Sequence, residues 1–372
     1  MKLAFLNDGI YAYASGLPCA VGGAERQQLL LARAVTSAGW AVTVGVRDMM
    51  RPGERKLING VEFVGIDQGQ ILLAWYRFLS SERPDWWYWR CAYHLWGAAV
   101  ELASVAGVRT IFSTALDSDV NPRHALFWRP RWWPLYAWGL SRTDRIFVQH
   151  RGQLSGLPKR WQPKAYVVPS VAGQSGFVTP HWQREKYVAW VAVLRQVKRP
   201  DLLIEIASKT PNIRFVVCGG PSSFMSSPGY GERILSELRA VPNIDFRGPV
   251  APEVAEQIIG NAAVFLSTSE EEGFPNTFLQ AWSSGTPVVS LKIDPDRIIQ
   301  KKKLGMVSGS IQGAIADIEG LLESPQDREK IGVRTRTHIA DAHSEKAAVM
   351  GFQYAIEGRR LLNPHESTSV AV

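Results

Sequence analysis

The chain has 372 residues, 46% of them hydrophobic and 20% charged, which is the balance of an ordinary globular protein. This length is too great for one ordinary core and suggests two domains of about 150–200 residues each. No run of 18 apolar residues occurs, which excludes a membrane-spanning helix, and the N-terminal MKLAFLNDGI is predicted to be a buried strand and not a signal peptide. The cysteines are far apart and have no metal-ligand spacing, so we expect reduced thiols in a cytosolic protein: Cys19, Cys91 and Cys218.

The net charge of +8 comes from one segment, residues 120–164. Asp144 is the only acid in this segment, and its nine basic residues are Arg123, Arg129, Arg131, Arg142, Arg145, Arg151, Lys159, Arg160 and Lys164. The same region is rich in tryptophan, because nine of the 14 tryptophans lie between Trp75 and Trp138.

The first half of the chain alternates strands with helical segments. Its clearest helix is GGAERQQLLLARAVTSAG at 22–39, which has apolar residues at helical spacing and ends at a glycine. The predicted strands are LAFLND at 3–8, WAVTVGV at 40–46, PDWWYWR at 84–90, VRTIFST at 108–114, DRIFVQH at 144–150 and AYVVPS at 165–170. By default we expect the tryptophans of WWYW to pack in the core.

A loose stretch at 170–182, SVAGQSGFVTPHW, reads as a linker, and strand–helix units then repeat. The predicted strands there are VAWVAVL at 188–194, IRFVVCGG at 213–220, NIDFRG at 243–248, AVFLST at 263–268 and, as the last strand, TPVVSLKI at 286–293. The order predicts two doubly wound, Rossmann-like α/β domains that face a cleft, with domain limits of 1–170 and 171–344. We expect a helix at about 345–363 to return to the first domain, and a flexible tail at 364–372.

Two loops of the second domain are predicted to meet. Open parallel sheets bind ligands at the carboxyl ends of strands, where the strand order reverses. The usual order would bring Arg195 and Lys198, after the first strand, beside Glu272 and the helix that starts near Asn276. Two cations, a glycine and a helix N-terminus suit a diphosphate. From spacing alone, a solvated loop beside an acidic surface turn remains an equal alternative.

EGFPNTFLQAWSSGTPVVS at 272–290 resembles the signature of retaining glycosyltransferases of the GT-B fold, in glycosyltransferase family 4 (glycosyl transferases group 1). That signature has a glutamate, seven residues and a second glutamate, followed by a small residue, a glycine and a Pro-Val-Val strand. Further matches follow in the family's order: VGGAERQQLLLARA at 21–34, VAVLRQVKRPDLLIEIA at 191–207, VVCGGP at 216–221, NIDFRGPV at 243–250 and SLKIDPDRII at 290–299.

The resemblance implies a retaining transfer of a sugar from a nucleotide diphosphate sugar to a hydroxyl acceptor, in polysaccharide or glycoconjugate biosynthesis, with no cofactor and no metal. Glu272, Lys198 and Arg195 would be catalytic, with the two cations neutralising the leaving phosphates. The donor would also be bound by Gly220, Gly273, Phe274, Pro275, Asn276, Thr277 and Gln280. Gly22 and Gly23 would let the first domain close on the diphosphate.

The chain departs from the family pattern in three places. Gln280 stands where the second glutamate is expected, and since an amide still hydrogen-bonds a ribose hydroxyl, we expect activity to be retained. The stretch IFSTALDSD lacks the histidine that many family members have near the donor sugar, and we assign no catalytic role to His94, His124 or His150. The arginine lies three residues before Lys198, closer than in many relatives.

Asp117 and Asp119 form an Asp-x-Asp pattern, which holds a metal in other glycosyltransferase folds. Here it follows a strand of the first domain, so we expect it to bind the acceptor or to be structural.

The segment Phe127 to Arg142, FWRPRWWPLYAWGLSR, combines arginines with aromatic residues. One interpretation is a folded loop with its tryptophans in the core. The other is that the segment docks on the inner membrane leaflet or binds a lipid diphosphate acceptor. The family resemblance implies a saccharide or lipid-linked acceptor and an enzyme in the cytoplasm or at the cytoplasmic face of the membrane.

Other function classes remain. A nucleotide-sugar epimerase on the same fold would act without an acceptor, and a non-catalytic sugar-nucleotide-binding subunit would neither hydrolyse nor transfer the donor. Nucleic-acid binding is not expected, because the basic segment has no recognised reading motif.

Overall fold

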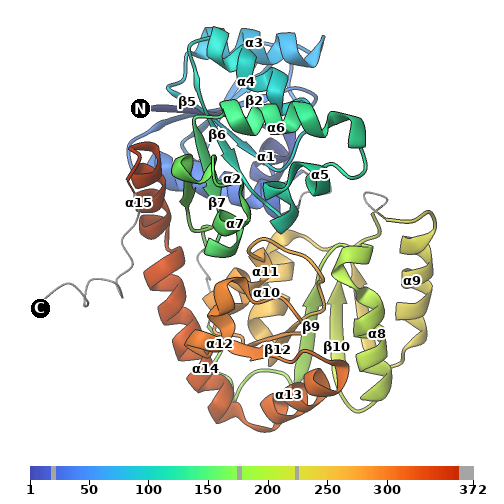
Figure 1. Cartoon of the computed structure of the whole chain (residues 1–372). Coiled ribbons are helices and arrows are strands. Elements are labelled where there is room, and N and C mark those ends of the chain that lie inside the picture. Colours follow the sequence, from blue (N-terminus) through green and yellow to red (C-terminus); the bar gives the residue numbers. More distant parts are fainter. Residues whose placement is uncertain (18–21, 174–177, 223–225, 360–372) are drawn as a thin grey trace, which may run out of the picture. The chain divides into compact units, whose positions relative to one another are not determined.

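The computed structural model describes residues 1–17, 22–173, 178–222 and 226–359, so Cys19 and the predicted tail at 364–372 lie outside the described residues. The chain divides into two compact units (Figure 1). Unit 1 consists of Met1–Val171 and the chain from Glu345 onward, and unit 2 of Ala172–Ser344.

Unit 1 contains an eight-stranded sheet with the order β3-β4-β2-β1-β5-β6-β7-β8. All neighbouring strands are parallel except β3 and β4, which form an antiparallel pair at one edge. The strands are β1 (Lys2–Leu6), β2 (Ala41–Val46), β3 (Arg55–Ile58), β4 (Val61–Gly65), β5 (Trp86–Arg90), β6 (Arg109–Ser113), β7 (Arg145–Val148) and β8 (Ala165–Val167).

Helices cover both faces of this sheet. The α-helices of unit 1 are α1 (Asp8–Ala14), α2 (Gly23–Ser37), α3 (Ile71–Glu82), α4 (Trp96–Val105), α5 (Pro122–Ala125), α6 (Trp133–Arg142), α7 (Arg151–Gly156) and α15 (Glu345–Ile356), with 3-10 turns η1 (Asp117–Val120), η2 (Pro130–Trp132) and η3 (Gln162–Lys164). α1, α2 and α15 pack in one core cluster, and α3, α4 and α6 in another. The strand period of two explains this, since Trp86 joins the first cluster and its neighbour Trp87 the second. Both side chains are buried, which confirms core packing for these two tryptophans.

Unit 2 contains a six-stranded parallel sheet with the order β11-β10-β9-β12-β13-β14, so the strand order reverses between β9 and β12. The strands are β9 (Tyr187–Val191), β10 (Arg214–Cys218), β11 (Ile244–Gly248), β12 (Val264–Ser267), β13 (Val288–Ser290) and β14 (Gly305–Val307). The helices are η4 (Gln196–Lys198), α8 (Pro200–Lys209), α9 (Tyr230–Ala240), α10 (Pro252–Asn261), α11 (Asn276–Ser283), η5 (Pro295–Arg297), α12 (Ile298–Lys302), α13 (Ile311–Glu323), α14 (Pro325–His338) and the π-helix η6 (Ile339–His343). α8, α9 and α13 cover one face, and α10, α11 and α12 the other.

The predicted fold class, two doubly wound α/β units, is confirmed. Three details of the prediction are wrong. The hairpin β3–β4 was not predicted, because its exposed edge strand lacks a continuous apolar run. The predicted last strand was β13, whereas β14 follows it with only three residues. The C-terminal helix α15 contacts α2, β7 and β8 but ends at Ile356, since Gly358 adopts a positive φ of 77° just beyond it.

Candidate functional site

Two loops meet at the carboxyl edge of the unit 2 sheet, where the order reverses. Val188 and Ala189 of β9 pair with Val264 and Phe265 of β12. Beyond the strands, the backbone N–H of Glu270 donates to the carbonyl oxygen of Val197 at 2.8 Å. The Thr268 hydroxyl donates to the carbonyl oxygen of Lys198 at 2.7 Å and accepts from the Trp190 indole N–H at 3.0 Å. The two loops are therefore held together by hydrogen bonds before any ligand is considered.

Lys198 and Glu272 form an ion pair across these loops, with side chains 22% and 13% exposed. The strand order predicted that they would lie side by side, and the structure places them so. The Arg195 Nε donates to the Ser222 hydroxyl at 3.3 Å, in the loop that follows β10. The catalytic roles of these three residues stay predictions.

The loop after β10 approaches β9 closely at a glycine. Gly219 has a φ of +147°, and a Cβ there would lie 1.8 Å from the carbonyl oxygen of Ala192. Gly220 differs, because the nearest atom to a Cβ there would be in Pro249 at 3.6 Å, an ordinary contact distance. The backbone therefore requires a glycine at Gly219 but not at Gly220, and the donor-binding role of Gly220 stays a prediction.

The turn between Glu272 and α11 is largely buried. Gly273, Phe274 and Pro275 are buried, and the Phe274 ring lies against His343, with centroids 4.9 Å apart. Asn276 and Thr277 open the helix and are half-buried. The N–H groups of a first helical turn lack intrahelical partners and carry the positive end of the helix dipole. This end of α11 therefore suits an anion.

Gln280 lies one turn further along α11, on the same face as Asn276. Its side-chain amide donates to a carboxylate oxygen of Glu256, on α10, at 3.4 Å. The predicted contact of Gln280 with a ribose hydroxyl stays a prediction.

The glycine loop of unit 1 is described only from Gly22 onward. Gly22 caps α2, its N–H donates to the Glu25 carboxylate at 2.9 Å, and Gly23 is the first helical residue. Their proposed closure on a diphosphate is untested.

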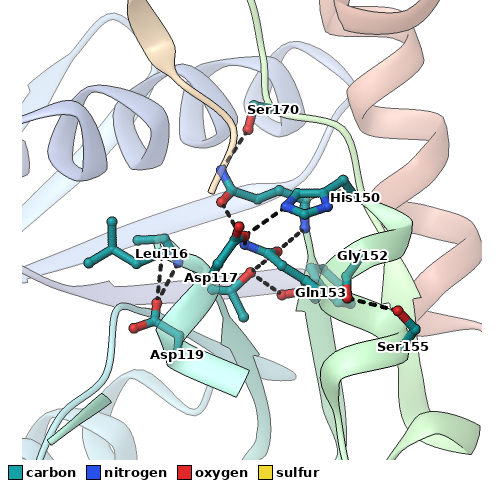
Figure 2. A network of polar contacts seen from close by, with 12 residues as sticks. Leu116, Asp117, Asp119, His150, Gly152, Gln153, Ser155 and Ser170 are labelled. Carbon is teal, nitrogen blue, oxygen red and sulfur yellow. Dashed lines mark hydrogen bonds and ion pairs between the residues drawn. The ribbon is translucent and has the colours of Figure 1, made fainter. Parts of the chain in front are cut away.

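At the carboxyl edge of the unit 1 sheet, the two predicted aspartates differ (Figure 2). Asp119 is buried, and one carboxylate oxygen accepts from the backbone N–H groups of Ala115 at 2.6 Å and Leu116 at 3.1 Å. Burial raises the pKa of Asp119 to about 6, against the lowering effect of these hydrogen bonds. Asp119 therefore stabilises its own turn, which is the structural role that was expected as one alternative for the Asp-x-Asp pattern.

Asp117 faces outward and is held by two residues that the sequence analysis did not select. His150 Nε2 lies 2.8 Å from Asp117 Oδ1, and the Gln153 amide donates to the same oxygen at 3.0 Å. No short motif joins residues 33 and 36 positions apart. The only available signal was that His150 ends a predicted strand and Gln153 follows it closely, as Asp117 follows another predicted strand.

In the basic, aromatic segment at 127–142, several large side chains are exposed: Phe127, Trp128, Trp132 and Trp138. Arginines accompany them, with Arg129 over the Trp128 ring and Arg142 over that of Trp138. The alternative that places the tryptophans in the core is therefore wrong for Trp128, Trp132 and Trp138, whereas Trp133 is partly buried against a core cluster.

Within the described residues, no three His, Cys, Asp or Glu side chains gather as a metal site. A search of the same residues finds no helix with the length and hydropathy to cross a membrane.

Comparison with known proteins finds a family model that matches part of the second unit. Residues 185–324 match the family model described as Glycosyl transferases group 1, as the sequence motifs indicated. The D-inositol 3-phosphate glycosyltransferase of Mycolicibacterium smegmatis is 26% identical over 185 residues, which are 48% of this chain. The aligned part spans only 43% of that relative.

Two solved structures resemble the whole chain. The sucrose-phosphate synthase of Thermosynechococcus elongatus has a TM-score of 0.74 and 14% identity, covering 96% of this chain and 98% of its own. The Anabaena protein HepE, in complex with UDP and glucose, has a TM-score of 0.70 and 14% identity, covering 96% and 99%. At this identity the likeness shows the fold alone, which is that of the GT-B class.

Proposed function

We propose that this chain, whose residues 185–324 match the family model of the glycosyl transferases group 1, is a glycosyltransferase that moves a sugar from a nucleotide diphosphate sugar to a hydroxyl. The observation that carries the proposal is the Lys198–Glu272 pair at the N-terminus of α11, inside the family-matched region. Cleavage of the sugar–phosphate bond leaves negative charge on the diphosphate. The Lys198 cation and the N-terminus of α11 would stabilise that charge as it develops.

The assignment of roles follows from position. Lys198 leaves Glu272 and turns to the diphosphate when the donor binds, and Glu272 then faces the sugar. Backbone groups from Gly273 to Thr277 contact the sugar and phosphates, Gly220 gives room beside them, and Gln280 contacts the ribose. Arg195 supports the phosphates from the loop that holds Ser222. Gly22 and Gly23 close on the diphosphate, no metal takes part, and the transfer retains the anomeric configuration.

The substrate class is inferred from proteins of similar sequence or fold. The M. smegmatis relative is named for transfer to D-inositol 3-phosphate, and HepE was solved with UDP and glucose. We therefore place UDP sugars first among the donors. We also propose that the acceptor is a saccharide or a lipid-linked molecule, and that the reaction serves polysaccharide or glycoconjugate biosynthesis at the cytoplasmic face.

Product analysis tests this function against its alternatives. The chain is incubated with UDP-, GDP- and ADP-sugars, with and without saccharide acceptors, and the products are separated by chromatography and mass spectrometry. Release of nucleoside diphosphate together with a glycosylated acceptor supports the transferase. An isomerised nucleotide sugar formed without acceptor identifies an epimerase, and binding without any turnover identifies a non-catalytic subunit.

The basic, aromatic segment at 127–142 supplies a second part of the proposal, a peripheral contact with an anionic membrane. Phe127 is 60% exposed and Trp138 52%, and four arginines lie within or beside the segment: Arg123, Arg129, Arg131 and Arg142. Exposed aromatic rings favour the headgroup level, and arginines attract anionic lipids.

Vesicle co-sedimentation tests the membrane contact. We expect binding to vesicles that contain phosphatidylglycerol, reduced several-fold in Trp132→Ala. Trp182→Ala is the matched control, because Trp182 is 68% exposed but lies in unit 2. Equal binding to neutral vesicles, or an equal loss of binding in both variants, would contradict the proposed membrane contact.

A further inference from the structure

The outward-facing carboxylate of Asp117 differs in exposure and in hydrogen-bond partners from a carboxylate that only stabilises the fold. Asp119, two residues away, is 4% exposed and its carboxylate accepts backbone N–H groups of its own turn. The Asp117 side chain is 52% exposed, although both of its hydrogen-bond partners belong to buried residues. A carboxylate needed only for folding gains little from such exposure, whereas a carboxylate that meets a ligand requires it.

The partners of Asp117 are themselves fixed. Gln153 donates through its Nε2 to Asp117, while its Oε1 accepts from the Thr114 hydroxyl at 2.7 Å and from the backbone N–H of Gln149 at 2.8 Å. The amide orientation of Gln153 is thereby set, with its donor directed at Asp117 (Figure 2). His150 occupies the N-cap position of α7 and is 7% exposed.

Both hydrogen bonds reach the same oxygen of the carboxylate. Among the described residues, His150 and Gln153 contact Oδ1, and the half-exposed side chain also presents Oδ2. A carboxylate has about four acceptor positions, so Oδ2 can accept O–H or N–H donors from a ligand. Its negative charge disfavours phosphates and carboxylates as ligands, which restricts the class to neutral or cationic donors.

We propose that Asp117, oriented by His150 and Gln153, is a hydroxyl-binding subsite of unit 1 that accepts a hydrogen bond from the saccharide acceptor. This inference rests on the proposed function, because the acceptor is the second substrate of that reaction. Asp117 contacts the ligand, whereas His150 and Gln153 are positioning residues. Asp119 has no part in binding.

The test is a titration followed by NMR, with histidine labelled at 13Cε1 and the His150 signal identified by its absence in His150→Gln. The probe is methyl α-D-glucopyranoside, and the control ligand is its fully O-methylated derivative, which has no O–H to donate. Asp144→Asn is the matched control variant. Asp144 is also an exposed aspartate that accepts two hydrogen bonds, from Thr110, but at the opposite edge of the same sheet.

We expect the glucoside to shift the His150 signal saturably in the wild type and in Asp144→Asn. In Asp117→Asn the affinity should fall at least about tenfold, because a hydrogen bond to a charged group is lost. The absence of a shift in the wild type, an equal shift with the methylated ligand, or an unchanged affinity in Asp117→Asn would each overturn the subsite.

A parallel thermal-shift measurement with nucleotide sugars separates the two proposals. If nucleotide sugars stabilise the wild type but the glucoside has no effect, the subsite alone fails. If the glucoside binds through Asp117 and no nucleotide sugar binds, the transferase function fails and Asp117 remains a saccharide-binding residue.

Discussion

The two sheets end in edges of similar topology but different chemistry. The unit 2 edge sets a lysine against a glutamate beside a helix N-terminus, and this arrangement suits a phosphate group. The unit 1 edge surrounds one carboxylate with a histidine and an amide, which suits a neutral hydroxyl. Strand order alone therefore indicates where a ligand binds, and the side chains at the strand ends decide which ligand.

Of the variants at these two edges, Lys198→Ala should have the largest effect, because it removes the cation of the unit 2 edge. Lys198→Ala should lower the turnover number about 10²- to 10³-fold, the range found when one hydrogen-bond donor to a developing oxyanion is removed. Steady-state kinetics with the donor found by the product screen measures the effect. Lys209→Ala is the control, since Lys209 also pairs with a glutamate, Glu205, but on the exposed surface of α8. A similar activity in both variants would contradict the role of Lys198.

The pH dependence of stability should identify Asp119 as the structural member of the unit 1 edge. Burial raises the folded-state pKa of Asp119 from 3.8 to about 6, so the folded state binds the proton more tightly than the unfolded state. The resulting contribution to the unfolding free energy is fully present below pH 3.8 and is lost as the pH rises through 6. Relative to Asp119→Asn, the wild type should lose about 3 kcal/mol of unfolding free energy between pH 3.5 and pH 7. Urea unfolding at several pH values measures this difference. A difference that does not change with pH would contradict the assignment.

The backbone of the unit 2 edge should depend on Gly219. Gly219→Ala combines a positive φ with a Cβ that would clash with the Ala192 carbonyl, and should lower the unfolding free energy by about 1–3 kcal/mol or more. Gly220→Ala should leave the unfolding free energy nearly unchanged and weaken donor binding instead. Urea unfolding and donor titration of both variants check this. Equal destabilisation would show that the two glycines have the same role.

Gln280 should have the smallest effect on the unit 2 edge. Gln280→Ala should weaken donor binding about fivefold, the value of one net hydrogen bond of about 1 kcal/mol. Gln280→Glu should restore a ribose acceptor but place a carboxylate near Glu256, to which the native amide donates at 3.4 Å. Titration calorimetry of both variants, with exposed Gln257→Ala as the control, measures the effect. No change in either variant would remove Gln280 from the site.

The sequence predicted most of the strands and the unit 2 edge, because buried parallel strands are continuous apolar runs and the order of motifs implies the order of strands. Lys198 and Glu272 could be placed together in this way, although they are 74 residues apart. The hairpin β3–β4 and the three-residue β14 were missed, since partly exposed or short strands carry little periodicity.

The unit 1 edge was harder to predict for a physical reason. The pairing of Asp117 with His150 and Gln153 depends on side-chain directions after two strand ends, and no spacing rule encodes these directions. The same limit applies to Arg195. The sequence indicated a cation near the site, but it did not predict that the Arg195 Nε donates to the Ser222 hydroxyl.

The most direct test of the account is the thermal stability of the wild type and of Lys198→Ala, measured with increasing UDP, GDP and ADP and their sugars. A ligand at 100 times its dissociation constant stabilises the folded state by about 2.7 kcal/mol. We predict a concentration-dependent rise in Tm for at least one nucleotide in the wild type and a much smaller rise in Lys198→Ala. The absence of any rise in the wild type, or an equal rise in both proteins, would contradict a donor site at this edge.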